Sequence, residues 1–321
     1  MWKTIVRRFL ILIPQLFILS VLIFLLAQIM PGDALRGFMG PDTTLEQIEH
    51  LREIHGLNDP WYIQYLRWIR GILFEQDFGT SIAHSRPVLD VIGDRIMNTM
   101  RLSFLTALFT YIIALPLGLI AGRKHDKFID RGIMIYTFVA LSMPTVVLSV
   151  MHILLYGFNL GWFPPFGSVD PTLAAGTAEY WISRLHHLIL PAITLALLST
   201  VAIIYYLRSE IIDYETSDFV LTARSKGVPE NDIYTGHILR NSFLPIASTI
   251  GLVITGLFTG SVFIETTFAY PGMGQLFIQS ITGRDFPVAN TLILFYAVLT
   301  VLGIALSDII ITIIDPRIRI K

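Results

Sequence analysis

Six long apolar runs constrain the fold of this chain more than any other feature. They lie at about 9–30, 102–122, 132–156, 188–207, 243–264 and 288–314. Each has close to the ~20 residues that an α-helix needs to cross about 30 Å of hydrocarbon. Only 15% of the 321 residues are charged, against roughly 25% in an average soluble domain. We therefore predict an all-α membrane protein with six transmembrane helices and both termini on the same side.

The first apolar run has two interpretations. Lys3, Arg7 and Arg8 precede it, as basic residues precede the core of a secretory signal peptide. The run is longer than the usual signal core, and it ends in Ala-Gln-Ile-Met-Pro-Gly without an Ala-x-Ala cleavage site. We predict a retained first transmembrane helix within residues 1–30, with a cytoplasmic N-terminus.

Basic residues set the predicted orientation. The proposed inner segments are 1–8, 123–131, 208–242 and 315–321, and they contain every lysine of the chain. The two shorter outer loops carry only Arg184 and Arg284. Because Lys and Arg concentrate on the cytoplasmic side, we predict that both termini and segment 208–242 are cytoplasmic.

Residues 31–101 are polar enough to form a helical extracellular domain between the first two membrane helices, and 102–314 would form the membrane core. Thr43-x-x-Glu46 is a capping-box pattern for a helix that Gly56 ends. A second helix would start at Pro60 and carry an apolar stripe. The stripe is Trp61, Tyr65, Trp68, Ile69 and Ile72. It would pack in a small helical core, or it would meet a partner or the membrane surface.

The longest polar segment of the C-terminal half runs from Ser217 to Pro245 and predicts two short helices. Ser217 or Asp218 can cap the first helix, and Gly227 can end it in the left-handed conformation. Pro229 suits the first position of a second helix that runs toward Asn241. This segment is either a docking element for a partner or an ordinary amphipathic connector.

Several polar and small residues within the apolar runs remain open to two interpretations. Asp308, Glu265 and His152 are functional candidates because ionisable groups at membrane depth are costly, although Asp308 could be solvated at the interface. Gly256-x-x-x-Gly260 would form either a subunit interface or a packing face within the chain. Pro116, Pro144 and Pro191 could kink their helices.

Several classes of function are disfavoured. The chain has no cysteine, and its net charge of −1 indicates no nucleic-acid partner. It has no phosphate-binding Gly-x-x-x-x-Gly-Lys motif, no Gly-x-Ser-x-Gly and no His-Glu-x-x-His. The adjacent His186 and His187 point in different directions on a helix and do not form a metal pair. We predict no catalytic residues, no metal site and no cofactor in this chain.

The polar segment also resembles a known family. Leu221-Thr222-Ala223-Arg224-Ser225-Lys226-Gly227, followed by His237-Ile238-Leu239-Arg240-Asn241 and Leu244-Pro245, is similar to the cytoplasmic coupling loop of ABC importer permeases. The peptide branch of that family has Arg-Thr-Ala-Arg-Ala-Lys-Gly, so this chain differs at Leu221 and Ser225.

Further motifs of the same branch occur in the family's order. They are Pro31-Gly32-Asp33, Leu57-Asn58-Asp59-Pro60, Tyr65-Leu66, Asp77-Phe78-Gly79-Thr80-Ser81, Glu265-Thr266, Pro271-Gly272-Met273-Gly274-Gln275-Leu276, Gly283-Arg284-Asp285 and Asp315-Pro316-Arg317-Ile318-Arg319. The chain thus resembles permeases of the oligopeptide, dipeptide and nickel branch. Among these it is most similar to the first permease subunit of Gram-positive oligopeptide importers.

The resemblance implies a type I ABC importer permease fold in the bacterial cytoplasmic membrane. It implies a second homologous permease, two subunits that bind ATP and Mg, and an extracellular peptide-binding lipoprotein. It also implies two sets of functional residues. The ATPase-coupling set is Asp218, Phe219, Thr222, Ala223, Arg224, Lys226, Gly227 and Val228, and the external gate set is Glu265, Pro271, Gly272 and Gly274.

The implied function is oligopeptide import by alternating access, coupled to the separate ATPase subunits. Two alternatives stay open. One is a permease for dipeptides, a nickel chelate or another small solute, since that branch shares these motifs. The other is a membrane receptor component that senses peptides without transporting them.

Overall fold

The fold is described from a computed structural model. The structure describes residues 2–29, 58–242 and 261–314, with the isolated positions 44, 47, 49, 50, 53, 246, 255 and 256. Several predictions therefore lie outside the described residues: most of the helix before Gly56, the motif at 31–33, Leu244-Pro245, most of the fifth span, the Asp308 side chain and the tail 315–321.

The described elements are helices, apart from a single β-bridge between Thr80 and Pro87. In chain order they are α1 (Trp2–Ile29), α3 (Trp61–Arg70), η2 (Gly71–Glu75), α4 (Val88–Arg123), α5 (Phe128–Ser142), α6 (Thr145–His152), η3 (Ile153–Asn159), α7 (Ala178–Glu215), α8 (Asp218–Ser225), α9 (Glu230–Asp232), η4 (Ile233–Ile238), α11 (Met273–Thr282) and α12 (Phe286–Ile314). The elements labelled η are turns of π-helix.

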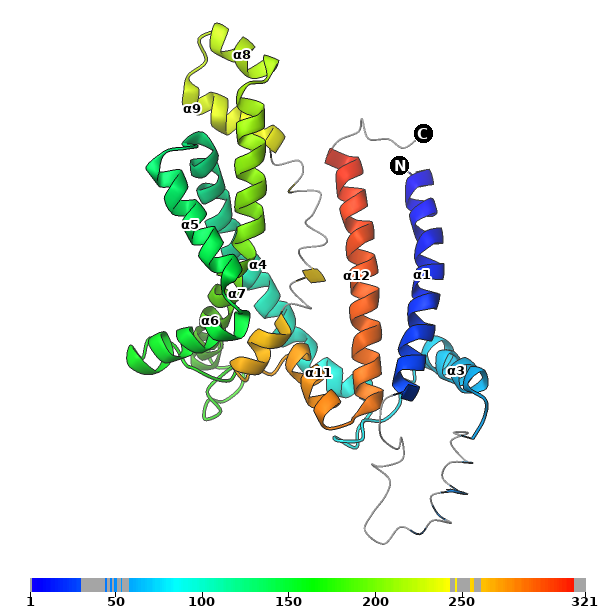
Figure 1. Ribbon diagram of the computed structural model, residues 1–321. Helices are drawn as coiled ribbons and strands as arrows, with labels where there is room; N and C mark the ends of the chain where they lie inside the picture. The colour runs from blue at the N-terminus through cyan, green and yellow to red at the C-terminus, as the bar shows by residue number, and fades with distance from the viewer. Residues whose placement is uncertain are drawn as a thin grey trace.

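Three helices of the described residues are long and apolar enough to cross a membrane: Val88–Arg123, Ala178–Glu215 and Phe286–Ser307. The pair α5 and α6–η3 passes the same criterion together but is bent by 105°. The start of α1 and the end of α12 lie at the same end of the molecule as α8 (Figure 1). The described part thus contains three spans, or four if the bent pair counts as one.

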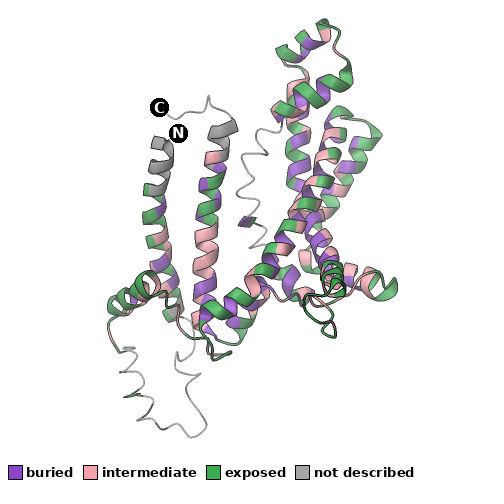
Figure 2. Cartoon of the chain, turned by 180° about the vertical axis from the view of Figure 1, so that it is seen from behind, coloured by how far each residue is buried: buried purple, intermediate pink, exposed green. Residues whose placement is uncertain are grey.

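The centre of the molecule is the pair α4 and α7, which pack along much of their length. Two glycines of α4 allow this approach. A Cβ atom added at Gly118 would lie 2.9 Å from Leu207 Cβ, and one at Gly122 would lie 2.7 Å from Ile211 Cβ. Small residues let two membrane helices come close, and buried residues gather along this pair (Figure 2).

The third predicted span, 132–156, corresponds to the bent pair α5 and α6–η3, in which the chain turns sharply at Met143-Pro144. Met143 is extended, with φ −87° and ψ 119°, and Pro144 precedes α6. Proline disfavours a helical conformation at the residue before it and removes one helical hydrogen bond. Pro116 and Pro191, by contrast, lie inside the continuous helices α4 and α7.

The outer segment also differs from its prediction. The helix expected to begin at 102 begins at Val88, so the last part of the predicted 31–101 domain belongs to α4. Thr43 and Glu46 lie outside the described residues. Next to them, Thr44 and Gln47 form reciprocal capping bonds of 3.0 and 3.3 Å.

The predicted aromatic stripe of α3 packs mainly against α1. Tyr65 is buried, and its hydroxyl lies 2.8 Å from the Ser20 hydroxyl of α1. Phe24 of α1 contacts both Tyr65 and Trp68. Trp61, at the start of the stripe, is 48% exposed. The stripe therefore belongs to a core shared with α1 rather than to a separate small domain.

Candidate functional site

The segment after α7 consists of two helices that meet at Gly227, as predicted. α8 ends at Ser225, and the chain is helical again from Glu230 to Ser242. Gly227 has φ +76°, in the left-handed region. Its N–H donates to Arg224 O at 3.0 Å, and the N–H of Val228 donates to Ala223 O at 3.2 Å. These two bonds form a Schellman motif, which explains why glycine occupies this position.

The predicted starts of the two helices need correction. Ser217 occupies the N-cap of α8, but its side chain caps no N–H and donates to Tyr214 O at 2.6 Å. A serine hydroxyl can bond either to the helix ahead or to the backbone behind it, and here the last turn of α7 provides the acceptor. Pro229 is the N-cap of α9, one position earlier than predicted.

One face of α8 points into the protein. Val220 and Ala223 are buried in a cluster with Ile211 of α7 and with Ile233 and Ile238 of η4. Val228 packs against the same cluster. Ala223, which the resemblance placed among the coupling residues, is therefore a contact that fixes α8 in the fold.

The opposite face of α8 is exposed and carries four of the eight predicted coupling residues. Asp218, Phe219, Thr222 and Lys226 are exposed on it. Leu221 and Ser225 belong to the same surface and were not in the predicted set. Phe219 is 38% exposed and Leu221 is 50% exposed. Sequence periodicity could have identified Leu221, because it is out of phase with the buried Val220 and Ala223. We call the six residues Asp218, Phe219, Leu221, Thr222, Ser225 and Lys226 the α8 surface.

Arg224 binds across the glycine turn. Its Nε donates to Glu230 Oε1 at 2.8 Å, and its Nη1 donates to the carbonyl of Glu215 at 3.3 Å. The hydrogen bond from Arg224 holds the pKa of Glu230 below its usual value and raises the pKa of Arg224. A carboxyl group with a lowered folded-state pKa stabilises the fold above its unfolded pKa and loses that effect as the pH falls. Because Glu230 is exposed, this pair orients α8 more than it stabilises it.

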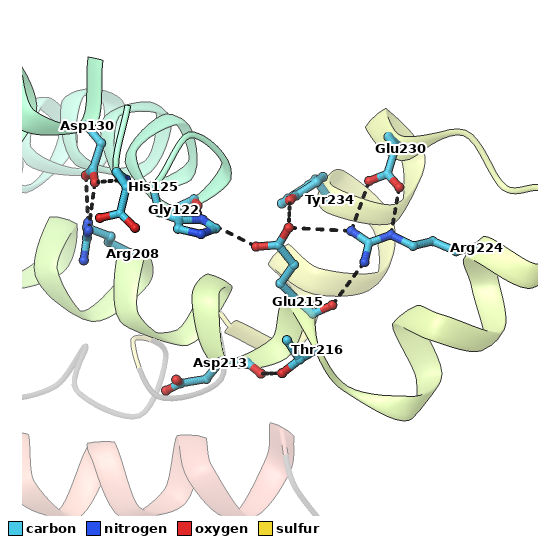
Figure 3. A network of polar contacts seen from close by, with 11 residues as sticks. Gly122, His125, Asp130, Arg208, Asp213, Glu215, Thr216, Arg224, Glu230 and Tyr234 are labelled. Carbon is cyan, nitrogen blue, oxygen red and sulfur yellow. Dashed lines mark hydrogen bonds and ion pairs between the residues drawn. The ribbon is translucent and has the colours of Figure 1, made fainter. Parts of the chain in front are cut away.

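Glu215, at the end of α7, joins three parts of this region (Figure 3). Its Oε1 accepts from the Tyr234 hydroxyl at 2.8 Å and lies 3.7 Å from Arg224 Nη2. Its Oε2 lies 3.5 Å from His125 Nδ1, in the turn between α4 and α5. Burial, followed by the bond to Glu215, raises the pKa of Tyr234 to about 12, so its hydroxyl stays protonated and donates. No sequence motif marks Glu215.

A second polar contact between helices lies next to the contacts of Glu215. Arg208 of α7 donates to Asp130 of α5 twice, from Nε to Oδ1 at 2.7 Å and from Nη2 to Oδ2 at 2.8 Å (Figure 3). The N–H of Asp126 adds a bond to Oδ2 at 2.9 Å. The Asp130 side chain is only 3% exposed. Planar bidentate pairs of this kind fix geometry, so the ends of α5 and α7 are held together.

The predicted gate residues Glu265, Pro271, Gly272 and Gly274 form a packed corner toward the other end of α4, which we call the Glu265 corner. Glu265 is buried, and its carboxylate accepts four hydrogen bonds. The donors are Thr99 Oγ1 at 2.8 Å, Ser261 Oγ at 2.9 Å, Gly274 N at 2.7 Å and Gln275 N at 3.1 Å. Two of these donors are at the N-terminus of α11, where a carboxylate is favourable.

The glycines of the corner are required by close packing. A side chain at Gly272 would overlap the carboxyl group of Glu265 and Thr99 Oγ1, and a Cβ at Gly274 would lie 2.6 Å from Val262 Cα. Pro271 O accepts from Asn98 Nδ2 at 2.8 Å. The structure brings all four predicted residues together, and their role as a gate stays a prediction.

Asp285 joins two motifs through contacts that were not predicted from the sequence. Its carboxylate accepts from the Ser81 hydroxyl and from the N–H groups of Ile82 and Ala83, at 3.1 and 3.2 Å. The motif Asp77–Ser81 and the motif Gly283–Asp285 are thus in direct contact, although they are about two hundred residues apart in the chain.

Two family models together match most of the chain. "Binding-protein-dependent transport system inner membrane component" matches residues 114–320, and the N-terminal model of membrane components of the same transport systems matches residues 1–103. The oligopeptide transport system permease protein AppB of Bacillus subtilis is 38% identical over 98% of both chains. The glutathione transport system permease protein GsiC of Escherichia coli is 33% identical over the full length of both.

One solved structure defines the fold more closely. A chain of the MetNI methionine ABC transporter in an inward-facing conformation superposes with a TM-score of 0.57. The match covers 70% of this chain and 96% of that chain, at 16% identity. At this identity the likeness shows the fold alone, which is that of a type I ABC importer permease.

Proposed function

The chain belongs to the family of binding-protein-dependent transport system inner membrane components, and from this premise we propose that it is a pore subunit of an ATP-driven peptide importer. An external binding protein would deliver oligopeptides, and separate ATPase subunits would drive alternating access. The full-length similarity to AppB, named as an oligopeptide permease, supports peptides as the substrate class.

The observation that carries this proposal is the way α8 is attached. Its exposed surface combines Phe219 and Leu221 with charged and hydroxyl side chains, which suits a protein partner. Its buried face packs on α7 and η4, and Arg224 ties it to Glu215. A partner that moves the α8 surface would therefore move the end of α7, and through His125 the turn between α4 and α5.

We place the α8 surface in the cytoplasm. All lysines fall in the segments that this orientation puts inside, which supports it. The full topology would be six membrane helices with cytoplasmic termini and an extracellular helical segment between the first two.

The complete importer would contain partners that the family implies. They are a second homologous permease, two ATP-binding subunits that hold ATP and Mg, and an extracellular peptide-binding lipoprotein. In this scheme the ATPase subunits bind the α8 surface, the lipoprotein meets the opposite side, and lipids surround the remaining apolar faces. The present chain would bind neither ATP nor a metal.

The first test is to purify the tagged chain from its native membrane in detergent and identify the proteins that accompany it. We expect a second membrane component of this family and one or two ATPases. Reconstitution of that complex with its binding protein should then give ATP-dependent peptide accumulation in vesicles. Recovery of the chain alone, under conditions that preserve other ABC complexes, would contradict the proposal. An intact complex that binds peptide without accumulating it would favour a receptor.

A further inference from the structure

Two arginines, one from the first half of α4 and one from the second turn of α7, converge in the part of these helices that lies away from α8. Arg184 donates from Nη2 to Asn98 Oδ1 at 2.8 Å and from Nη1 to the Tyr180 hydroxyl at 3.0 Å. Arg101 reaches the same Asn98 oxygen at 3.5 Å. Both guanidinium groups lie over the ring of Trp181, 5.7 and 5.8 Å from its centre. Two positive charges therefore share one neutral oxygen and one aromatic ring.

These two charges are not paired with a carboxylate within the part of the chain that the structure describes. Neither arginine has an ion-pair partner there, and Arg184 Nε is buried without an acceptor. The carboxylate of Glu265, also in this region, is occupied by its four hydrogen bonds within the Glu265 corner. Both arginines are half-buried, so solvent screens their repulsion less than on an open surface.

Asn98, the residue that both arginines contact, is itself fixed by hydrogen bonds to Pro271 and Tyr270. Asn98 is buried, and its amide nitrogen donates to Pro271 O at 2.8 Å. The Tyr270 hydroxyl donates to the backbone carbonyl of Asn98 at 3.3 Å. Asn98 therefore presents its side-chain oxygen to the arginines in a fixed orientation, and the Glu265 corner supports it. Such a prepared, positively charged position is typical of an anion site.

We propose that Arg101 and Arg184 form a receiving site for the C-terminal carboxylate of the transported peptide. The inference rests on the proposed function, which makes this end of α4 and α7 the extracellular side. A guanidinium group binds a carboxylate through two parallel N–H bonds, and Trp181 supports both cations from one side. Every linear peptide carries this carboxylate whatever its sequence, so one site would serve a mixture of peptides. The flexible end of a peptide can also reach half-buried arginines more easily than a carboxylate on the surface of a folded protein can.

The test compares two peptides that differ only at the C-terminus, one a free acid and the other an amide. Uptake is measured with the reconstituted complex, its binding protein and ATP, for the wild type, Arg101→Gln and Arg184→Gln. We expect uptake of the acid at limiting concentration to fall about tenfold or more, as for loss of one charge-assisted hydrogen bond. Uptake of the amide should stay near the wild-type value, so the ratio of acid uptake to amide uptake should fall. The binding protein is the same throughout, so its own preference cancels.

The matched control is Arg86→Gln, which removes an arginine from an exposed pair with Asp94 just before α4. It should leave the ratio unchanged. Arg101→Gln keeps the inference testable if Arg184→Gln fails to assemble, because the hydrogen bond of Arg101 to Asn98 is long, at 3.5 Å, whereas Arg184 makes two shorter ones. An equal fall for acid and amide would overturn the inference, and so would an unchanged ratio.

If the variants changed only the concentration of binding protein needed for half-maximal ATP hydrolysis, the inference would also be overturned. That result would assign the two arginines to a contact with the binding protein. A wild-type complex that accumulates neither peptide would instead contradict the proposed function. The two failures are therefore distinguishable.

Discussion

At the scale of single residues, the backbone of Gly227 determines where α8 ends. A residue with a Cβ atom in the left-handed conformation costs roughly 1–2 kcal/mol. An aspartate there would also place a negative charge at the C-terminal end of α8, where the helix dipole is already negative. We expect Gly227→Asp to abolish peptide uptake while the protein still inserts in the membrane, measured as uptake and as protein level in isolated membranes.

Gly236→Asp is the matched control for this change. Gly236 is exposed in η4, its φ is not positive, and a Cβ added there meets no atom within 4 Å. It should transport at close to the wild-type rate. Wild-type uptake by a normally assembled Gly227→Asp complex would show that the geometry of α8 does not matter for coupling.

The two apolar residues of the α8 surface should account for much of its affinity for the ATPase. Full burial of a Phe or Leu side chain contributes about 1.5–3 kcal/mol. Both side chains are already partly exposed, so their loss should not change folding. We expect Phe219→Ala combined with Leu221→Ala to weaken binding of the ATPase subunits at least about tenfold, measured by titration in detergent.

Thr235→Ala, on the exposed side of η4, is the control for that experiment. It should bind like the wild type. Unchanged affinity of the double variant, with an unchanged unfolding temperature, would place the ATPase contact elsewhere on the chain.

At the scale of elements, the Glu215 side chain links the region of α8 to the turn between α4 and α5. Glu215→Ala removes the acceptor of Tyr234 and the carboxylate next to Arg224 and His125. The α8 surface itself is untouched, so the ATPase should still bind. We expect ATP hydrolysis to continue while peptide transported per ATP falls several-fold, measured in proteoliposomes.

Glu230→Ala is the comparison, because it also removes a carboxylate that binds Arg224. Glu230 is more exposed than Glu215 and, among the described residues, forms no ion pair with the turn between α4 and α5. Its effect on the transport ratio should be small, as for other exposed pairs. Equal effects of the two variants would mean that Arg224 alone, and not the connection through Glu215, transmits the motion.

At the scale of the whole molecule, the proposed orientation can be tested directly. The chain has no natural cysteine, so a single introduced thiol reports only its own position. Ser225→Cys on α8 and Ala175→Cys in the segment before α7 are both exposed. We expect a membrane-impermeant maleimide to label Ala175→Cys in intact cells, and Ser225→Cys only after permeabilisation. The opposite labelling pattern would show that the topology is inverted and that α8 lies on the side of the membrane away from the ATPase subunits.

The local features of the fold were largely predictable. Lengths of apolar sequence predicted α4, α7 and α12, because the thickness of a bilayer sets how long a spanning helix must be. The left-handed turn at Gly227 was predictable, because that conformation depends on a single residue type. The exposed polar residues of α8 followed from the family motif and helical spacing.

Contacts between distant residues were decided only by the tertiary structure. Arg224 turns inward because Glu230 and the end of α7 provide acceptors, and Ala223 is buried because η4 packs over it. The contact between Ser81 and Asp285 and the convergence of Arg101 on Arg184 depend on how helices far apart in the chain are placed.

The three prolines show most clearly which features depend on the local sequence and which depend on the tertiary structure. By itself the sequence determined which stretches are apolar, how long they are and where a helix can break, because these depend on composition and on the residue's own backbone. Pro116, Pro144 and Pro191 carry the same local signal, yet the chain turns sharply only at Pro144. Whether a proline bends a membrane helix depends on the neighbours that satisfy the freed carbonyl groups, and only the packing of the whole chain provides those neighbours.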